Sequence, residues 1–152
     1  MKMAHMSDIN KWIEFRKELH KFPELSGIEV KTSEKVYNTL KKFTPDQLYN
    51  KLGGNGVMAT FFCDQFEEAE TLLFRAELDA IAIQEESGEG HASKKEGVMH
   101  GCGHDGHMAI LLGVAEYLHH NPPRNCNISL LFQPAEETGK GAARSYVSRE
   151  NF

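Results

Sequence analysis

Three short apolar runs and three longer segments of helical periodicity constrain the fold of this chain most. The runs are rich in β-branched and aromatic residues and predict buried strands at residues 57–63, 71–78 and 127–132. Apolar residues at helical spacing predict helices at residues 7–22, 28–43 and 105–120, and another from Gly139 onward. Strands that alternate with helices predict an α/β fold, with a mostly parallel or mixed sheet flanked by helices.

Composition and length narrow the class of protein. The 152 residues fit one domain with a core of its own, and the net charge of −5 gives no basic footprint for nucleic acid. No apolar run approaches the roughly 20 residues that span a bilayer, so no membrane partner is expected. Three scattered cysteines form no disulfide framework, which favours the cytoplasm. Residues 1–6 (MKMAHM) are interpreted as a cloning remnant, and residues 7–152 as the domain.

The segment MHGCGHDGH, residues 99–107, carries the clearest chemical signal. Cys102 and His104 lie two residues apart in a glycine-rich stretch, and thiolate and imidazole both bind zinc or a similar divalent ion. Asp105 and His107 are expected to orient a ligand through hydrogen bonds. The alternative for these two residues is capping of the helix that begins here. His100 is either part of the site or an ordinary loop residue.

Carboxylates follow two of the predicted strands. Asp79 comes directly after the strand that ends near Leu78, and the pair Glu136 and Glu137 follows the strand that ends near Phe132. Open α/β sheets bind ligands beyond the carboxyl ends of their strands, so these groups are expected to meet the 99–107 segment at one edge. One glutamate would then bind metal while the other takes a proton from water. A solvated acidic pair is the alternative, with Asp79 as a strand-end cap; Glu77 and Glu85 are expected to be structural or solvated.

Four segments together resemble a known family. RKELHKFPELSGIE (16–29), LLFRAELDAIAI (72–83), GVMHGCGHDGHMAILLGVA (97–115) and ISLLFQPAEETGKGA (128–142) occur in the order found in the aminoacylase-type dinuclear metallopeptidases. The resemblance is to the branch of hippurate hydrolases, auxin-conjugate hydrolases and N-acyl-amino-acid amidohydrolases. The third and fourth segments are the most specific.

The resemblance implies a role for each site residue. Cys102, His104 and Glu137 would be metal ligands, Glu136 the general base and Asp79 a catalytic carboxylate that supports the site. Two divalent ions are implied, zinc or manganese, with cobalt or nickel as alternatives. The substrate would be an N-acyl amino acid or a peptide-like conjugate, and the enzyme a possible homo-oligomer. Glu77 departs from the family, which usually has aspartate there.

The length of this chain also differs from that of the family. Members of the family are much longer, with an inserted lid domain and two further histidine ligands downstream. The chain is therefore expected to be the N-terminal part of a metallopeptidase catalytic domain.

Two other classes of function compete with the hydrolase. An inactive fragment with an incomplete metal site would bind metal weakly and self-associate through exposed apolar surface. A thiol enzyme would use Cys102 as its nucleophile beside a histidine. The adjacent glutamates disfavour the thiol enzyme, and inhibition by a chelator would count against it.

Overall fold

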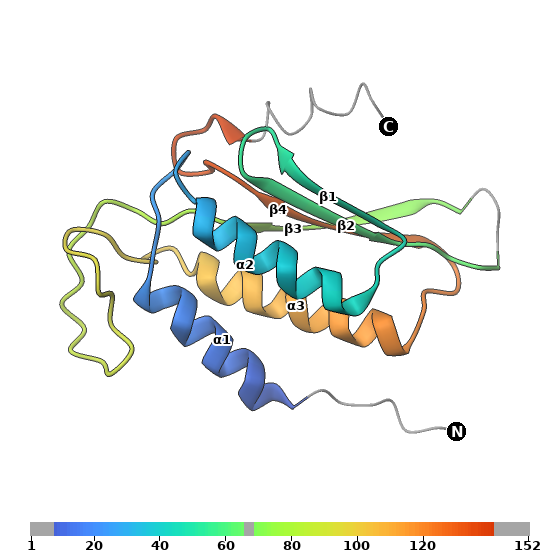
Figure 1. Cartoon of the computed structure of the whole chain (residues 1–152), viewed down its shortest axis with the longest axis horizontal. Coiled ribbons are helices and arrows are strands. Elements are labelled where there is room, and N and C mark those ends of the chain that lie inside the picture. The colour runs from blue at the N-terminus through green and yellow to red at the C-terminus, as the bar shows by residue number, and fades with distance from the viewer. Residues whose placement is uncertain (1–7, 66–68, 142–152) are drawn as a thin grey trace.

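The computed structural model describes residues 8–65 and 69–141. A four-stranded mixed sheet and three α-helices form the domain, and the helices lie together on one side of the sheet (Figure 1). The α/β class expected from the sequence, a mixed sheet flanked by helices, is confirmed. Residues 1–6 and most of the helix expected from Gly139 onward lie outside the described residues.

The helices follow the sequence pattern closely. They are α1 (Ile9–Lys21), α2 (Val30–Leu40) with the 3₁₀ turn η1 (Lys41–Phe43), and α3 (His104–His120). Asp8 caps α1, because its side chain accepts a hydrogen bond from the Asn10 backbone N–H. Trp12 and Leu19 of α1 are buried as the periodicity predicts, whereas Ile9 and Ile13 are exposed.

The sheet has the strand order β1-β2-β4-β3. Its strands are β1 (Gln47–Leu52), β2 (Gly56–Phe61), β3 (Thr71–Glu77) and β4 (Asn127–Gln133). β3 and β4 are parallel, while β1 and β2 join antiparallel. Since β3 and β4 run in the same direction, their carboxyl ends reach the same edge of the sheet, with Glu77 opposite Gln133.

The core lies between the sheet and the helices. Alternate residues of β2 and β4, which share one face, pack against the apolar stripe of α3 and against α2. The buried members from these four elements are Val57, Ala59, Phe61, Leu130, Phe132, Met108, Leu111, Leu112, Ala115, Leu118, Val36 and Leu40.

The expectation that 71–78 is a buried strand is wrong for most of β3. Thr71 to Arg75 are exposed, and the exposed fractions of Leu72 and Phe74 are 51% and 47%. The reason is that β3 is an edge strand, with a partner on one side only among the described residues. β1, at the opposite edge, was not expected at all, because QLYNKL lacks an apolar run.

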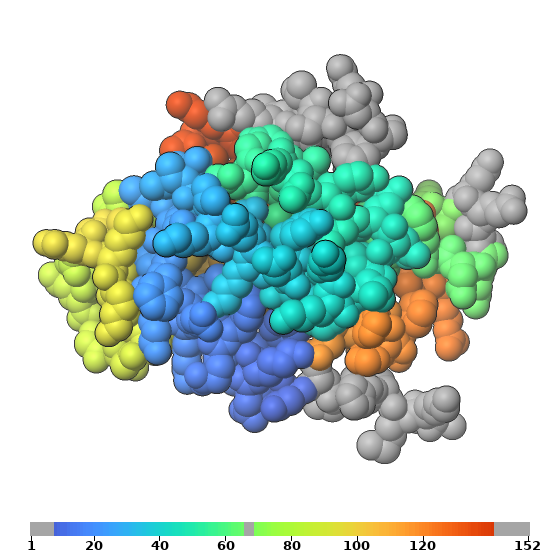
Figure 2. All heavy atoms as spheres, in the orientation of Figure 1, coloured from blue at the N-terminus to red at the C-terminus, as the bar shows by residue number. Residues whose placement is uncertain are grey.

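The polar segment after β3 folds over one end of the molecule. Residues 84–98 lie beside α1, as the space-filling view shows (Figure 2). The Lys94 N–H donates to the carbonyl of Lys21 at 2.8 Å, and Ile81 and Met99 pair through their backbones where the segment begins and ends. Within the part of the chain that the structure describes, no helix has the length and apolar character needed to cross a bilayer.

Candidate metal centre

The polar segments singled out in the sequence meet at the carboxyl ends of β3 and β4. His104 is the first residue of α3, and its Nε2 lies 3.9 Å from an oxygen of Glu136 and 3.8 Å from an oxygen of Glu137. The three ligand atoms of this group all lie within 4.8 Å of one another. One imidazole nitrogen and two carboxylates so placed match the donors that divalent zinc or manganese takes in proteins.

Asp79 holds the two sides of this group together. Its backbone carbonyl accepts a hydrogen bond from Nδ1 of His104 at 2.8 Å, so the lone pair of a neutral imidazole is on Nε2, toward the glutamates. Its Oδ2 accepts from the backbone N–H of Glu137 at 3.0 Å and from the Ser26 hydroxyl at 2.6 Å. The buried aspartate therefore orients both His104 and the loop that carries the glutamates.

Negative charge dominates the electrostatics of the site. Burial lowers the pKa of His104, but the hydrogen bonds to Asp79 and the attraction of Glu77 outweigh burial and raise that pKa to about 9. Burial raises the pKa of Asp79, whereas the interactions with His104, Ser26 and the Glu137 backbone prevail and lower it to about 2. An imidazole surrounded in this way by ionised carboxylates is a favourable place for a cation.

Cys102 lies in the turn before α3 and is exposed. A hydrogen bond with Glu137 raises the pKa of its thiol to about 11, and burial and the charges of Glu136 and Asp79 act in the same direction. Because the thiolate is the reactive form of cysteine, these carboxylates disfavour the thiol enzyme considered above. Cys102 thus adjoins the carboxylate side of the site, although its sulfur is outside the group of three converging ligand atoms.

The other residues expected at the site have separate partners. His107, on the first turn of α3, contacts Glu77 through Nδ1 at 2.8 Å. The other oxygen of Glu77 pairs with Arg75 at 3.0 Å, so this buried glutamate joins β3 to the first turn of α3. Glu77 also lies 4.0 Å from Nε2 of His104. Asp105 is not part of this group and pairs with Arg16 and His20 of α1.

His100 is separate from the three converging groups. Its ring is buried, and burial lowers its pKa to about 4. Neither ring nitrogen has a hydrogen-bond partner within residues 8–65 and 69–141. Its ring centroid lies 6.3 Å from that of His20.

Glu29 supports the site and was not recognised in the sequence as doing so. This fully buried residue, just before α2, accepts the Ala135 backbone N–H at 2.7 Å and the Asn55 side-chain amide at 3.0 Å. Ala135 has a positive φ of 50° and immediately precedes Glu136. Glu29 therefore stabilises the strained turn that presents the glutamates.

Replacing Glu29 with alanine should destabilise the protein by about 1–3 kcal/mol, because the buried Ala135 N–H then loses its acceptor. Urea unfolding monitored by circular dichroism measures this difference. Glu29→Gln is the matched control, since its amide oxygen can still accept one hydrogen bond, and it should lose less stability. Equal stability of Glu29→Ala and the unaltered chain would contradict this role.

The comparisons with known proteins agree with the fold and the motifs. Residues 73–151, more than half of the chain, match the peptidase family M20/M25/M40. N-acetyldiaminopimelate deacetylase of Geobacillus thermodenitrificans is 36% identical over 145 residues, which cover 95% of this chain and 37% of that protein. The Bacillus subtilis protein of the same name is 36% identical over 134 residues, which cover 88% of this chain and 35% of the relative.

Comparison with solved structures also supports the fold and the family. The Bacillus subtilis YXEP protein, described as a dinuclear metal binding peptidase from the M20 family, superimposes with a TM-score of 0.84 at 33% identity. That match covers 91% of this chain and 38% of the other. A tripeptidase from Staphylococcus aureus shares the fold, with a TM-score of 0.66 at 14% identity. The chain thus spans between about a third and two fifths of the length of these relatives, and it belongs to the peptidase family M20/M25/M40.

Proposed function

We propose that this chain supplies the metal-binding and water-activating residues of an amidohydrolase that cleaves the amide bond of an N-acyl amino acid. The observation that carries the proposal is the convergence of His104, Glu136 and Glu137 beyond the parallel strands β3 and β4. Two similar relatives are named as deacetylases of N-acetyldiaminopimelate, which is itself an N-acyl amino acid. N-acetyl amino acids are therefore the first substrates to test, ahead of hippurate and auxin conjugates.

The donor set fits a divalent ion. His104 Nε2 and Glu137 would hold it, joined by the sulfur of Cys102 once the cation draws off the thiol proton. Zinc or manganese are the favoured ions, with cobalt or nickel as alternatives, and the description of a relative as a dinuclear metal binding peptidase supports a pair of ions. When bound, such ions polarise a carbonyl group and lower the pKa of water.

The carboxylates of this chain would have different roles in the reaction. Glu136, more exposed than Glu137, would accept a proton from the attacking water on its carboxylate and deliver that proton to the leaving amine. Asp79 would keep His104 Nδ1 as a hydrogen-bond donor and hold the Glu137 backbone. His107, paired with Glu77, and Asp105, paired with α1, would support the first turn of α3.

Reconstitution with Mn²⁺ or Zn²⁺ tests this function. The expected result is release of acetate from N-acetyldiaminopimelate and other N-acetyl amino acids, loss of that release with a chelator, and close to two ions per chain by elemental analysis. Absence of saturable metal binding, or hydrolysis that persists after the metal is removed, would overturn the proposal.

One observation favours the second candidate, a metal-binding module that self-associates. Leu72, Leu73 and Phe74 are exposed on the edge strand β3. Apolar side chains on an unprotected edge promote association between copies. Gel filtration of the reconstituted chain, combined with the elemental analysis and the hydrolysis assay, distinguishes the two candidates. A concentration-dependent oligomer that holds one ion weakly and shows no hydrolysis would support the module.

A further inference from the structure

The first turn of α3 carries His104 but has no side-chain cap. Its N-cap is Gly103, which has a φ of +84° and caps the helix only through its backbone carbonyl, which accepts from the N–H groups of Gly106 at 2.9 Å and His107 at 3.1 Å. A residue without Cβ leaves this backbone conformation accessible but does little to fix it. The position of His104 must therefore depend on contacts made by other elements.

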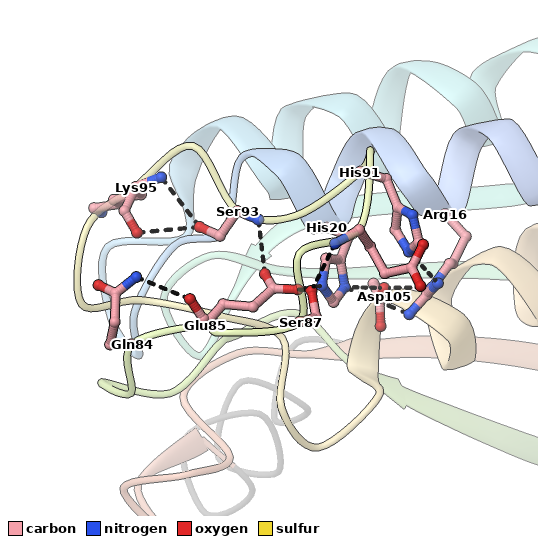
Figure 3. Close-up of polar contacts among 10 residues, drawn as sticks. Arg16, His20, Gln84, Glu85, Ser87, His91, Ser93, Lys95 and Asp105 are labelled. Carbon is pink, nitrogen blue, oxygen red and sulfur yellow. Dashed lines mark hydrogen bonds and ion pairs between the residues drawn. The ribbon is translucent and has the colours of Figure 1, made fainter.

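Asp105 makes contacts of this kind, in addition to the hydrogen bond between His104 and the Asp79 carbonyl. Its carboxylate, directly after His104, is completely buried, and Oδ2 accepts from Nε of Arg16 at 2.6 Å and from Nδ1 of His20 at 2.8 Å. Both donors belong to α1, so Asp105 ties the start of α3 to the neighbouring helix (Figure 3). Charge-assisted hydrogen bonds of this kind are the strong ones in proteins.

His20 extends the contact to the 84–98 segment. Its Nε2 lies 3.2 Å from Oε1 of Glu85, and its buried ring sits between this glutamate and Asp105 (Figure 3). Glu85 is itself held by the Ser87 hydroxyl and by the backbone N–H of Ser93 at 2.7 Å, which lowers the pKa of Glu85 to about 2. Both ring nitrogens of His20 therefore contact a carboxylate, which fixes the orientation of the ring toward Asp105.

We propose that His20 is a positioning residue for the metal centre: by hydrogen-bonding Asp105 from α1, it fixes the first turn of α3 and the direction of His104. His20 is not among the three converging ligand residues, so its effect on the site is transmitted through Asp105. The inference rests on the proposed metal-dependent function and names a residue on which that site depends.

Two substitutions separate the two bonds of His20. In His20→Asn the amide nitrogen replaces Nδ1, so the bond to Asp105 is kept and the bond to Glu85 is lost. In His20→Gln the amide nitrogen replaces Nε2, so the bond to Glu85 is kept and the bond to Asp105 is lost. His119→Gln, at the exposed far end of α3, is the matched control.

The first readout is Co²⁺ titration followed by visible absorption. His20→Gln should weaken Co²⁺ binding by about tenfold or more, the usual effect of losing a group that orients a ligand, and should change the absorption band. His20→Asn should bind Co²⁺ nearly as the unaltered chain does, as should His119→Gln. If His20→Gln does not fold, Arg16→Gln at a half-exposed position removes a donor to the same oxygen and should weaken binding as well.

The second readout needs no metal. Amide hydrogen exchange in the first turn of α3 should become faster in His20→Gln but not in His20→Asn, while the last turn keeps its rate. Equal Co²⁺ affinity of His20→Gln and the unaltered chain, or equal weakening in both His20 variants, overturns the inference and leaves the proposed function standing. No Co²⁺ binding by the unaltered chain overturns the proposed function, and hydrogen exchange then decides alone whether His20 positions α3.

Discussion

Replacing Glu136 with glutamine should abolish measurable hydrolysis of an N-acetyl amino acid while leaving divalent-metal binding close to that of the unaltered chain. Glutamine keeps the size of the side chain, but its amide cannot accept the proton of the attacking water. A positioned general base contributes roughly 10²–10⁴-fold to the rate, so a loss in this range is expected. Acetate release and elemental analysis on the same preparation measure both quantities.

Glu137→Gln is the matched comparison, because both carboxylates lie at almost the same distance from His104 Nε2, 3.9 Å for Glu136 and 3.8 Å for Glu137. The backbone of Glu137 is fixed by Asp79, which favours Glu137 as the ligand. Its substitution should therefore reduce metal content as well as activity. Near-normal activity of Glu136→Gln, or metal loss in that variant and not in Glu137→Gln, would contradict the assignment of roles.

The elements that could be predicted from the sequence are those whose pattern is local. The apolar stripe of α3, the cap at Asp8 and the runs that became β2 and β4 all follow from spacing and residue type. The meeting of Asp79, His104 and the two glutamates also followed, because parallel strands bring their carboxyl ends to one edge. Both of these predictions use short-range patterns and a general rule of α/β sheets.

What the sequence did not indicate depends on tertiary contacts. β1 pairs with β2 through its backbone, and its polar side chains carry no strand signal. Glu29 and Ala135 are 106 positions apart, and only the fold brings them into hydrogen-bond contact. For Asp105, the sequence allowed both helix capping and support of a neighbouring ligand. Its partners Arg16 and His20 lie on α1, and only the fold brings them into contact with it.

The burial of individual charged residues also depends on tertiary contacts. Glu77 and Glu85 were expected to be structural or solvated, and both side chains are more than 90% buried with hydrogen-bond partners. A lone glutamate in a sequence is usually exposed, so nothing local distinguishes these two from the solvated ones. Their partners, His107 and His20, lie on different helices.

Replacing His104 with alanine should remove most of the metal affinity. Its Nε2 is the one nitrogen among the three converging ligand atoms, and its Nδ1 is already oriented by the Asp79 carbonyl. Loss of a group that merely orients a ligand costs about 10–100-fold in affinity, so loss of the ligand itself should exceed about a hundredfold. Calorimetric titration with Zn²⁺ or Mn²⁺ measures this change.

The control for His104→Ala is His119→Ala, which is exposed, lies in the last turn of the same helix, and is roughly 22 Å from His104 along the helix axis at 1.5 Å per residue. It makes the same chemical change in α3 and should leave the metal affinity unchanged. Circular dichroism should show that both variants keep the fold, because the core contacts of α3 are made by its apolar stripe. If His104→Ala binds metal as tightly as His119→Ala, the ion is held elsewhere, and His104, Glu136 and Glu137 do not form the metal centre.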